Sequence, residues 1–283
     1  MRDCSDTIPH FLFSIRYLLL YKNNNNFNNN INIIAIYLKK FDNDTEYEEA
    51  RQNLILPNVS YCVSENEVHY NPYVDPYNGH EYVEIGGLKW ATMNVGANSI
   101  TDTGLYFQWG DTQGYTASQC GSGEGQKYFG WADYKYGNGT SDPSYTGMTK
   151  YNSTDDKAVL DASDDAAQTN WGGNWRMPTT EELLALGDAV NTAWTADYQG
   201  SGVAGMICTD KTDNSKVLFF PACGWCGDGN VYSVGDEGKY WSSTLYYSNE
   251  SFAMEWYFYS NIDMPWESET ERYSGRTVRA VVG

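Results

Sequence analysis

The stretch from 170 to 186 constrains the fold of this chain more than any other. It reads Asn-Trp-Gly-Gly-Asn-Trp-Arg-Met-Pro-Thr-Thr-Glu-Glu-Leu-Leu-Ala-Leu. The Gly pair allows positive φ or close packing, and Trp171 and Trp175 on either side offer large apolar surface to a core. Pro178 then ends any extended segment, because proline cannot donate to a strand ladder. We therefore expect a tight turn that two indoles anchor in the core.

A helix is predicted directly after this turn. Thr179 and Glu182 have the spacing of a capping box, in which the hydroxyl accepts from the Glu182 backbone N–H and the carboxylate reaches back. Leu183, Leu186 and Val190 then fall on one helical face. The sequence thus predicts both the start of the helix and the side that it buries.

Short apolar segments elsewhere predict antiparallel strands. They include a hairpin around Gly86-Gly87 and strands within 216–221, 240–244, 252–260 and 277–282. Residues 110–150, rich in Gly, Ser, Thr and Tyr, read as an elaborated loop, and residues 223–230 are also predicted to form a loop. Ser163 is expected to cap a second, short helix with Asp164 and Asp165 in its first turn. The predicted fold class is α+β, with two helices, short antiparallel strands, long loops, and chain ends brought together.

The first 75 residues differ in character from the rest. Residues 23–30 form an asparagine tract that is interrupted only by Phe27. Such a low-complexity segment is not expected to pack into a core. The apolar segment 11–21 contains Arg16 and is shorter than the roughly 20 residues of a transmembrane helix; nor does it read as a signal peptide. Residues 31–38 could be a strand or a short helix. We predict a divergent segment at 1–75 and a ligand-binding domain at 76–283.

Charge narrows the class of partner. The formal net charge is −19, and nearly all of it comes from residues 61–283, because residues 1–60 are almost balanced. No basic patch is evident, which argues against nucleic acid or an anionic membrane as partner. A solubilising surface explains most of these acidic residues. The aromatic content of 16%, with 24 Tyr and 10 Trp, leaves aromatic side chains for a surface as well as a core.

The six cysteines are too sparse for a scaffold built from disulfides. Cys223 and Cys226 have the spacing of a metal or redox motif, but the sequence holds no second such pair and only three His. A zinc site needs four ligands. Structural thiols or a local disulfide are therefore favoured, with zinc or redox chemistry as the alternative. No cofactor, metal ligand or catalytic residue is assigned.

Several motifs carry a family resemblance. Residues 175–182, Trp-Arg-Met-Pro-Thr-Thr-Glu-Glu, resemble the helix start of the sulfatase-modifying, formylglycine-generating branch of C-type-lectin-like folds. A wider ordered series is similar to the major paralogous domain family first noted in Fibrobacter. That series covers roughly 77–283 and comprises residues 86–97, 106–110, 240–244 and 275–281. The resemblance implies a C-type-lectin-like fold and display outside the cell.

Residues 244–273 are the predicted binding face. Phe252, Met254, Trp256 and Phe258 alternate with more polar neighbours, so one set should be buried and the other exposed to solvent. We expect Trp256 and Phe258 to be buried, and Glu255, Tyr257 and Tyr259 to form an outer row with the other candidate residues gathered beside it. Tyr, Ser, Asn and Trp predominate around them, the chemistry of antibody paratopes. A half-exposed strand of a tyrosine-rich protein would look the same. The candidate ligand-binding residues are Tyr246, Tyr247, Asn249, Glu255, Tyr257, Tyr259, Asn261, Asp263, Trp266 and Glu267.

Three hypotheses follow for function. The first is a non-enzymatic binder of a protein or glycan receptor on a cell surface, carried by a phage tail or a bacterial surface. Some proteins of similar fold are variable proteins of diversity-generating retroelements, and the abundance of Asn, Tyr, Ser and Asp in the face suggests the same here. The second is a formylglycine-generating-like oxidase, which would require Cys223 and Cys226 to hold copper. The third is a structural surface module. The oligomeric state is left open.

Overall fold

The computed structural model describes residues 16–23, 34–41, 61–63, 68–70, 75–139, 147–260 and 265–283. The chain divides into two compact units, Met1–Asp75 and Pro76–Gly283. In the first, β1 (Arg16–Asn23) pairs with β2 (Ile34–Phe41) and β3 (Tyr61–Val63) with β4 (Val68–Tyr70), both antiparallel. Within the segment 31–38, for which a strand or a short helix was predicted, residues 34–38 belong to a strand. None of the helices among the described residues is long and apolar enough to span a membrane.

The second unit is α+β, as the sequence predicts. Its helices are α2 (Ala166–Trp171) and α3 (Thr180–Ala189), with single 3₁₀ turns at Ala117–Gln119, Trp131–Asp133, Ala162–Asp164 and Tyr198–Gly200. Its strands are β5 (Tyr82–Ile85), β6 (Leu88–Asn94), β7 (Val190–Thr195), β8 (Gly205–Asp210), β9 (Val217–Pro221), β10 (Trp225–Gly227), β11 (Asn230–Tyr232), β12 (Glu237–Leu245), β13 (Phe252–Tyr259), β14 (Trp266–Glu271) and β15 (Arg279–Val282).

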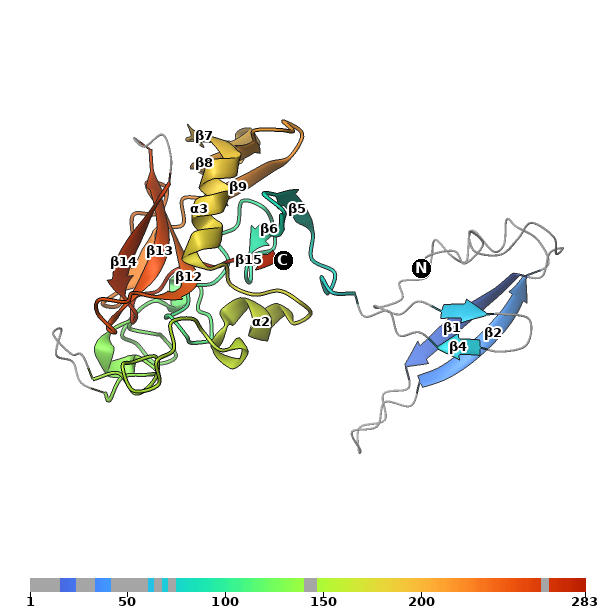
Figure 1. The fold of residues 1–283 in the computed structure, drawn as a ribbon, viewed down its shortest axis with the longest axis horizontal. Coiled ribbons are helices and arrows are strands. Elements are labelled where there is room, and N and C mark those ends of the chain that lie inside the picture. Colours follow the sequence, from blue (N-terminus) through green and yellow to red (C-terminus); the bar gives the residue numbers. More distant parts are fainter. Residues whose placement is uncertain are drawn as a thin grey trace. The chain divides into compact units, whose positions relative to one another are not determined.

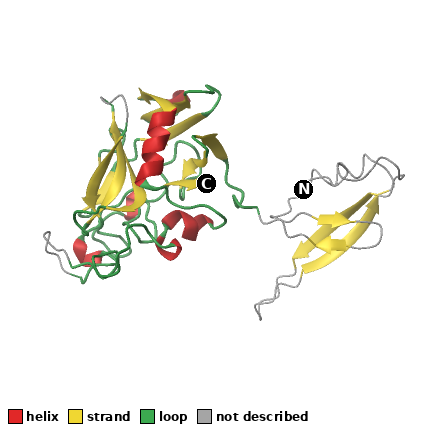
Figure 2. Ribbon diagram, viewed as in Figure 1, coloured by secondary structure: helices red, strands yellow, loops and turns green. Residues whose placement is uncertain are grey.

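Four small antiparallel sheets are present in the described part of this unit. The sheet β15–β6–β5 joins the last strand of the chain to the first two strands of the unit, so the two ends of the unit meet. Strands β7, β8 and β9 form a meander, β10 and β11 a hairpin, and β12, β13 and β14 a second meander. Helix α3 lies against both meanders (Figure 1 and Figure 2).

The Trp-Gly-Gly-Asn-Trp junction has the predicted geometry. Gly172 and Gly173 both have positive φ, and a Cβ on Gly173 would lie 2.6 Å from the Pro76 carbonyl oxygen, so this turn requires glycine there. Trp175 is fully buried and its indole N–H donates to the Tyr77 carbonyl oxygen at 2.6 Å. Trp171 is also buried, and its ring meets that of Trp175 edge-on.

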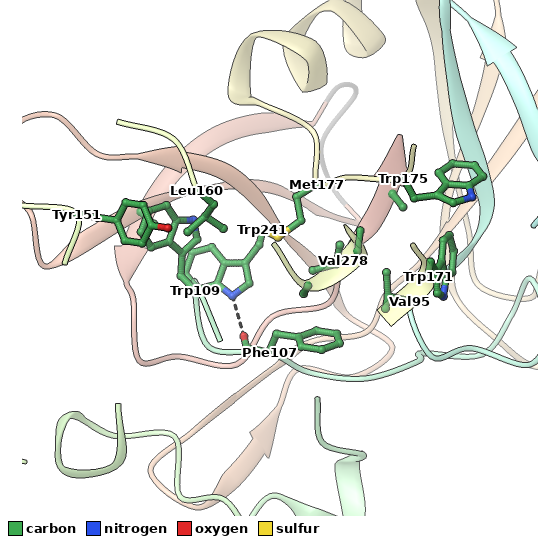
Figure 3. Close-up of a cluster of buried hydrophobic side chains, with 14 of the residues drawn as sticks. Val95, Phe107, Trp109, Tyr151, Leu160, Trp171, Trp175, Met177, Trp241 and Val278 are labelled. Carbon is green, nitrogen blue, oxygen red and sulfur yellow. Dashed lines mark hydrogen bonds between the residues drawn. The ribbon is translucent and has the colours of Figure 1, made fainter. Parts of the chain in front are cut away.

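Both indoles belong to a large aromatic core. Figure 3 shows Trp241 in that core, where its indole N–H donates to the Phe107 carbonyl oxygen at 2.8 Å. Trp109 and Tyr151 meet edge-on beside it, with ring centroids 5.1 Å apart. A second core lies beneath α3 and includes Leu183, Leu186, Trp256 and Phe258. The sequence motif at the junction thus anchors one core while the helix that follows it covers the other.

The start of α3 follows the predicted capping box. The Thr179 hydroxyl accepts from the Glu182 backbone N–H at 3.3 Å, and the Glu182 carboxylate accepts from the Thr179 backbone N–H at 2.9 Å. Arg176 also donates two hydrogen bonds to that carboxylate. Together these contacts lower the pKa of Glu182, although burial alone would raise it.

Removing this cap has a small, defined cost. Thr179→Ala is expected to lower the free energy of unfolding by about 1 kcal/mol, because one backbone N–H of the first turn loses its acceptor. Thr179→Ser keeps a hydroxyl there and is the matched control. Urea unfolding of both variants measures the difference, and equal midpoints for alanine and serine would contradict the capping role.

Two local predictions are wrong. Ser163 does not cap α2; it lies in the 3₁₀ turn before that helix, and the Asp165 carboxylate accepts from the Gln168 backbone N–H at 2.9 Å instead. The segment 223–230, predicted as a loop, contains strand β10 and leads into β11. Asp165 is the better cap because it also accepts from the Met177 backbone N–H at 2.8 Å, which fastens α2 to the junction.

Two buried arginines fasten the chain end to the rest of the unit. Arg279 donates to the Asn94 side-chain oxygen and to the backbone carbonyls of Ala91, Thr92 and Phe219. Arg272 donates to the Tyr134 hydroxyl and to the backbone carbonyls of Lys150, Tyr151 and Glu250. Each guanidinium satisfies several buried acceptors at once, which compensates for its own removal from water.

Candidate functional site

On the sheet β12–β13–β14, the face that carries Tyr257 opens to solvent at the end where Trp266 lies, whereas residues 240–243 of β12 are buried. Tyr257 on β13 is paired with Lys239 on β12 and with Trp266 on β14, so these three side chains share a face. Trp256 and Phe258 point to the opposite face, into the core beneath α3. The predicted burial of Trp256 and Phe258 is confirmed.

Glu255 corrects the predicted alternation. It lies on the same face as Tyr257 and Tyr259, but its side chain is 3% exposed. Its carboxylate accepts from the Arg276 Nε at 2.5 Å, and the Lys239 ammonium lies 3.9 Å from it. The prediction that Glu255 faces solvent is therefore wrong, because this face is covered by Arg276 until the strand reaches Tyr257.

Beyond Glu255 the same face carries a cluster of aromatic rings. The centroids of Tyr257 and Trp266 lie 5.2 Å apart, those of Tyr259 and Trp266 5.5 Å, and those of Tyr257 and Tyr259 5.6 Å. Trp266 is 40% exposed, and both tyrosines are half-buried. Three rings from two strands therefore support one another and remain open to solvent.

The β10–β11 hairpin extends this cluster. Trp225 on β10 stacks on Tyr232 of β11 with ring centroids 4.5 Å apart. The Lys239 ammonium bridges the two halves, at 5.6 Å from the Trp225 ring and 4.7 Å from the Tyr257 ring, within cation–π range. We call the six residues the aromatic platform: Trp225, Tyr232, Lys239, Tyr257, Tyr259 and Trp266.

Polar contacts hold the platform in place. The Tyr257 hydroxyl donates to the Glu237 carboxylate at 3.2 Å. Burial, together with this carboxylate, raises the pKa of Tyr257 to about 12, so the phenol stays protonated and remains a donor at physiological pH. Lys239 lies 3.6 Å from Glu237 at the surface and also faces Glu255 below. Arg276 completes the base, with its guanidinium carbon 5.0 Å from the Trp225 ring.

The predicted binding residues that the structure describes do not form one surface. Tyr257, Tyr259 and Trp266 come together in the platform. Residues 246–249, which include the predicted Tyr246, Tyr247 and Asn249, lie in the turn between β12 and β13, roughly 17 Å along the strand from Tyr257 at about 3.4 Å per residue. The prediction that these residues gather beside the outer row is wrong, because the β12–β13 pairing puts the turn at the far end of the sheet.

One further predicted residue points away from the platform. Glu267 is exposed but pairs with Trp256, so its side chain points to the opposite face of the sheet from Trp266. Asn261 and Asp263 lie outside the described residues.

Sequence reasoning missed half of the platform. Trp225 belongs to the segment 223–230, which was predicted as a loop. Tyr232 and Lys239 lie between that segment and residue 240, where the next strand was expected to begin. One signal was available: Trp225 is the large apolar residue between Cys223 and Cys226, and in a β-hairpin side chains alternate between faces. A hairpin at this position would have sent the indole outward while its cysteine neighbour turned inward.

Cys223 and Cys226 do not converge on one point. Cys223 packs in the core beneath α3, with its Sγ 3.5 Å from both the Asn94 side-chain nitrogen and the Tyr240 hydroxyl. Cys226 packs in a separate cluster with Cys120. Burial raises the pKa of both thiols, the opposite of what a reactive thiolate or metal ligand needs. Within the described ranges, no group of three or more His, Cys, Asp or Glu could hold a metal ion.

Comparison with known proteins gives one partial match. A family described as Domain of unknown function (DUF8237) matches residues 207–281, from β8 to β15. This range includes every residue of the aromatic platform, as well as Arg276 and Glu255. Searches of curated proteins and of solved structures found no match.

Proposed function

We propose that residues 76–283 form a non-enzymatic binding module with a C-type-lectin-like fold, which holds a protein or glycan receptor on its aromatic platform. The observation that carries the proposal is the ring cluster of Tyr257, Tyr259 and Trp266, which is open to solvent at one end of the sheet β12–β13–β14. Exposed aromatic side chains gathered in one patch are typical of interaction sites.

The chemistry of the platform favours recognition over catalysis. Tyrosine and tryptophan supply large, rigid contact area with few rotatable bonds, and a few such anchors carry most of the binding energy at protein interfaces. Lys239 and Glu237 add one donor group and one acceptor group at the centre of the rings. The platform is already held in position by Arg276 and Glu255, so little conformational entropy remains to be lost on binding.

The resemblance to C-type-lectin-like folds is supported by the architecture. The last strand of the unit pairs with its first hairpin, two helices flank small antiparallel sheets, and long loops connect them. We propose display on a phage tail or a bacterial cell surface on the strength of the resemblance. A variable protein of a diversity-generating retroelement remains part of the proposal, and a neighbouring reverse transcriptase gene with a near-repeat of the 3′ end would test it.

Binding is tested with the full chain, fluorescently labelled, against intact bacterial cells and a printed glycan array. Trp266→Ala is expected to weaken the binding found there by about 10–100-fold, the range for an aromatic anchor worth 1.4–2.8 kcal/mol. Tyr247→Ala is the matched control, since Tyr247 is an exposed aromatic at the other end of the sheet. Equal loss in both variants, or in neither, contradicts the placement of the site.

A further inference from the structure

Cys120 and Cys226 lie together in a small buried cluster, apart from the two larger cores, with Tyr106 and Phe129. Cys226 is fully buried and Cys120 is 9% exposed. The Cys120 thiol donates to the Asn230 carbonyl oxygen at 3.1 Å, and Asn230 is the strand partner of Gly227, the neighbour of Cys226. Both cysteines are free thiols in the structure.

The two backbones that carry these thiols are fixed against each other. The Gly229 N–H donates to the Tyr128 carbonyl oxygen at 2.7 Å, and the Asp228 N–H to the Phe129 carbonyl oxygen at 3.3 Å. These bonds dock the loop that follows Cys120 onto the turn of the β10–β11 hairpin. On the other side, Cys226 exchanges two backbone hydrogen bonds with Gly275, at 2.9 and 2.8 Å.

We propose that Cys120 and Cys226 form a disulfide that ties the long loop before α2 to the β10–β11 hairpin. Cys223, three positions from Cys226, is not the partner, because its thiol points into the core beneath α3, toward Asn94 and Tyr240. This pairing goes beyond the proposed binding function and does not depend on it.

The oxidant is a low-molecular-weight disulfide such as oxidised glutathione. One protein thiolate attacks a sulfur of that disulfide, its S–S bond breaks, and one glutathione leaves as a thiolate. The second cysteine loses its proton and attacks the mixed disulfide, which releases the second glutathione. Two protein thiols thereby lose two electrons and two protons, and the oxidant becomes two thiols. Burial raises the pKa of both protein thiols, so the bond forms while the chain folds rather than afterwards.

The disulfide would hold in place the half of the aromatic platform that the β10–β11 hairpin carries. Trp225 and Tyr232 are on the hairpin that it fastens, and Trp225 is the residue next to Cys226. The bond would close a loop of about 100 residues, the length at which a crosslink restricts the unfolded chain strongly.

The full chain, refolded in a glutathione redox buffer and alkylated, tests the pairing by tryptic mapping. Fragments 90–127 and 217–239 should be recovered as one linked species. Because fragment 217–239 contains both Cys223 and Cys226, Cys223→Ser should keep the link and Cys226→Ser should lose it. If Cys226→Ser does not fold, tandem fragmentation of the wild-type species locates the bond.

The crosslink should also be visible in stability. Adding a reductant should lower the wild-type melting temperature by roughly 5–15 °C and leave Cys120→Ser unchanged. Recovery of both fragments unlinked with Cys120 and Cys226 alkylated would overturn the proposal, and so would a bond located at Cys223.

Discussion

Replacing Trp175 by alanine is expected to lower the free energy of unfolding of the second unit by about 3–5 kcal/mol. The indole is fully buried, packs on Trp171 and His80, and donates to the Tyr77 carbonyl oxygen at 2.6 Å. Truncation removes this apolar contact area, leaves a cavity, and deprives the Tyr77 carbonyl of a donor.

The same substitution at Trp266 is the matched control for this prediction. Trp266 is 40% exposed, so its loss should cost no more than about 1–2 kcal/mol, a fraction of full burial. Urea or guanidinium unfolding followed by circular dichroism measures both variants. An equal loss in the free energy of unfolding at the two positions would contradict the role of Trp175 as an anchor of the core.

Glu255→Ala is expected to lower the free energy of unfolding by a similar amount, about 3–5 kcal/mol. The variant leaves the Arg276 guanidinium buried without its carboxylate, and an uncompensated buried charge is costly. Arg276 would keep its bond to the Thr270 hydroxyl at 3.0 Å, which does not neutralise the charge. Lys239 would also lose the carboxylate that faces it from below.

Glu267→Ala controls for the loss of one negative charge. Glu267 is on the same sheet but exposed, so its removal should change stability by less than about 0.5 kcal/mol. A second comparison uses Glu255→Ala with Arg276→Met, which removes both charges and should recover much of the lost stability. If Glu255→Ala and Glu267→Ala unfold at the same denaturant concentration, the buried pair has no structural role.

Local signals in the sequence predicted the junction and the start of α3 well, although the predicted helical face included Val190, which is the first residue of β7 instead. The glycine pair, the Thr179–Glu182 spacing and the leucines after it act within one or two turns of chain, so no distant partner is needed to interpret them. Strands β7, β8 and β14 were not predicted, because a strand is defined by partners that can be distant in the sequence. Strand β14 is an edge strand whose exposed Glu267 and Glu269 hide its pattern, although charges are common on such edges.

The platform could be predicted only in part, because it depends on which strand ends meet. Period-two alternation gave the correct face for Tyr257 and Tyr259. It could not show that Arg276, distant in sequence, covers that face at Glu255. Nor could it show that Trp225 stacks beside Lys239, a contact set by the docking of the hairpin on β12. Proximity in sequence placed Tyr247 in the site, whereas the antiparallel pairing places it at the other end of the sheet.

Hydroxyl-radical footprinting of the full chain, alone and bound to the cells or glycan that retain it, tests whether the aromatic platform is the binding site. Aromatic side chains react readily, and Tyr247, which is 92% exposed, serves as an internal reference. Binding is expected to protect Trp225, Tyr259 and Trp266 while Tyr247 stays as reactive as before. Protection of Tyr247 with the platform unchanged would contradict this expectation.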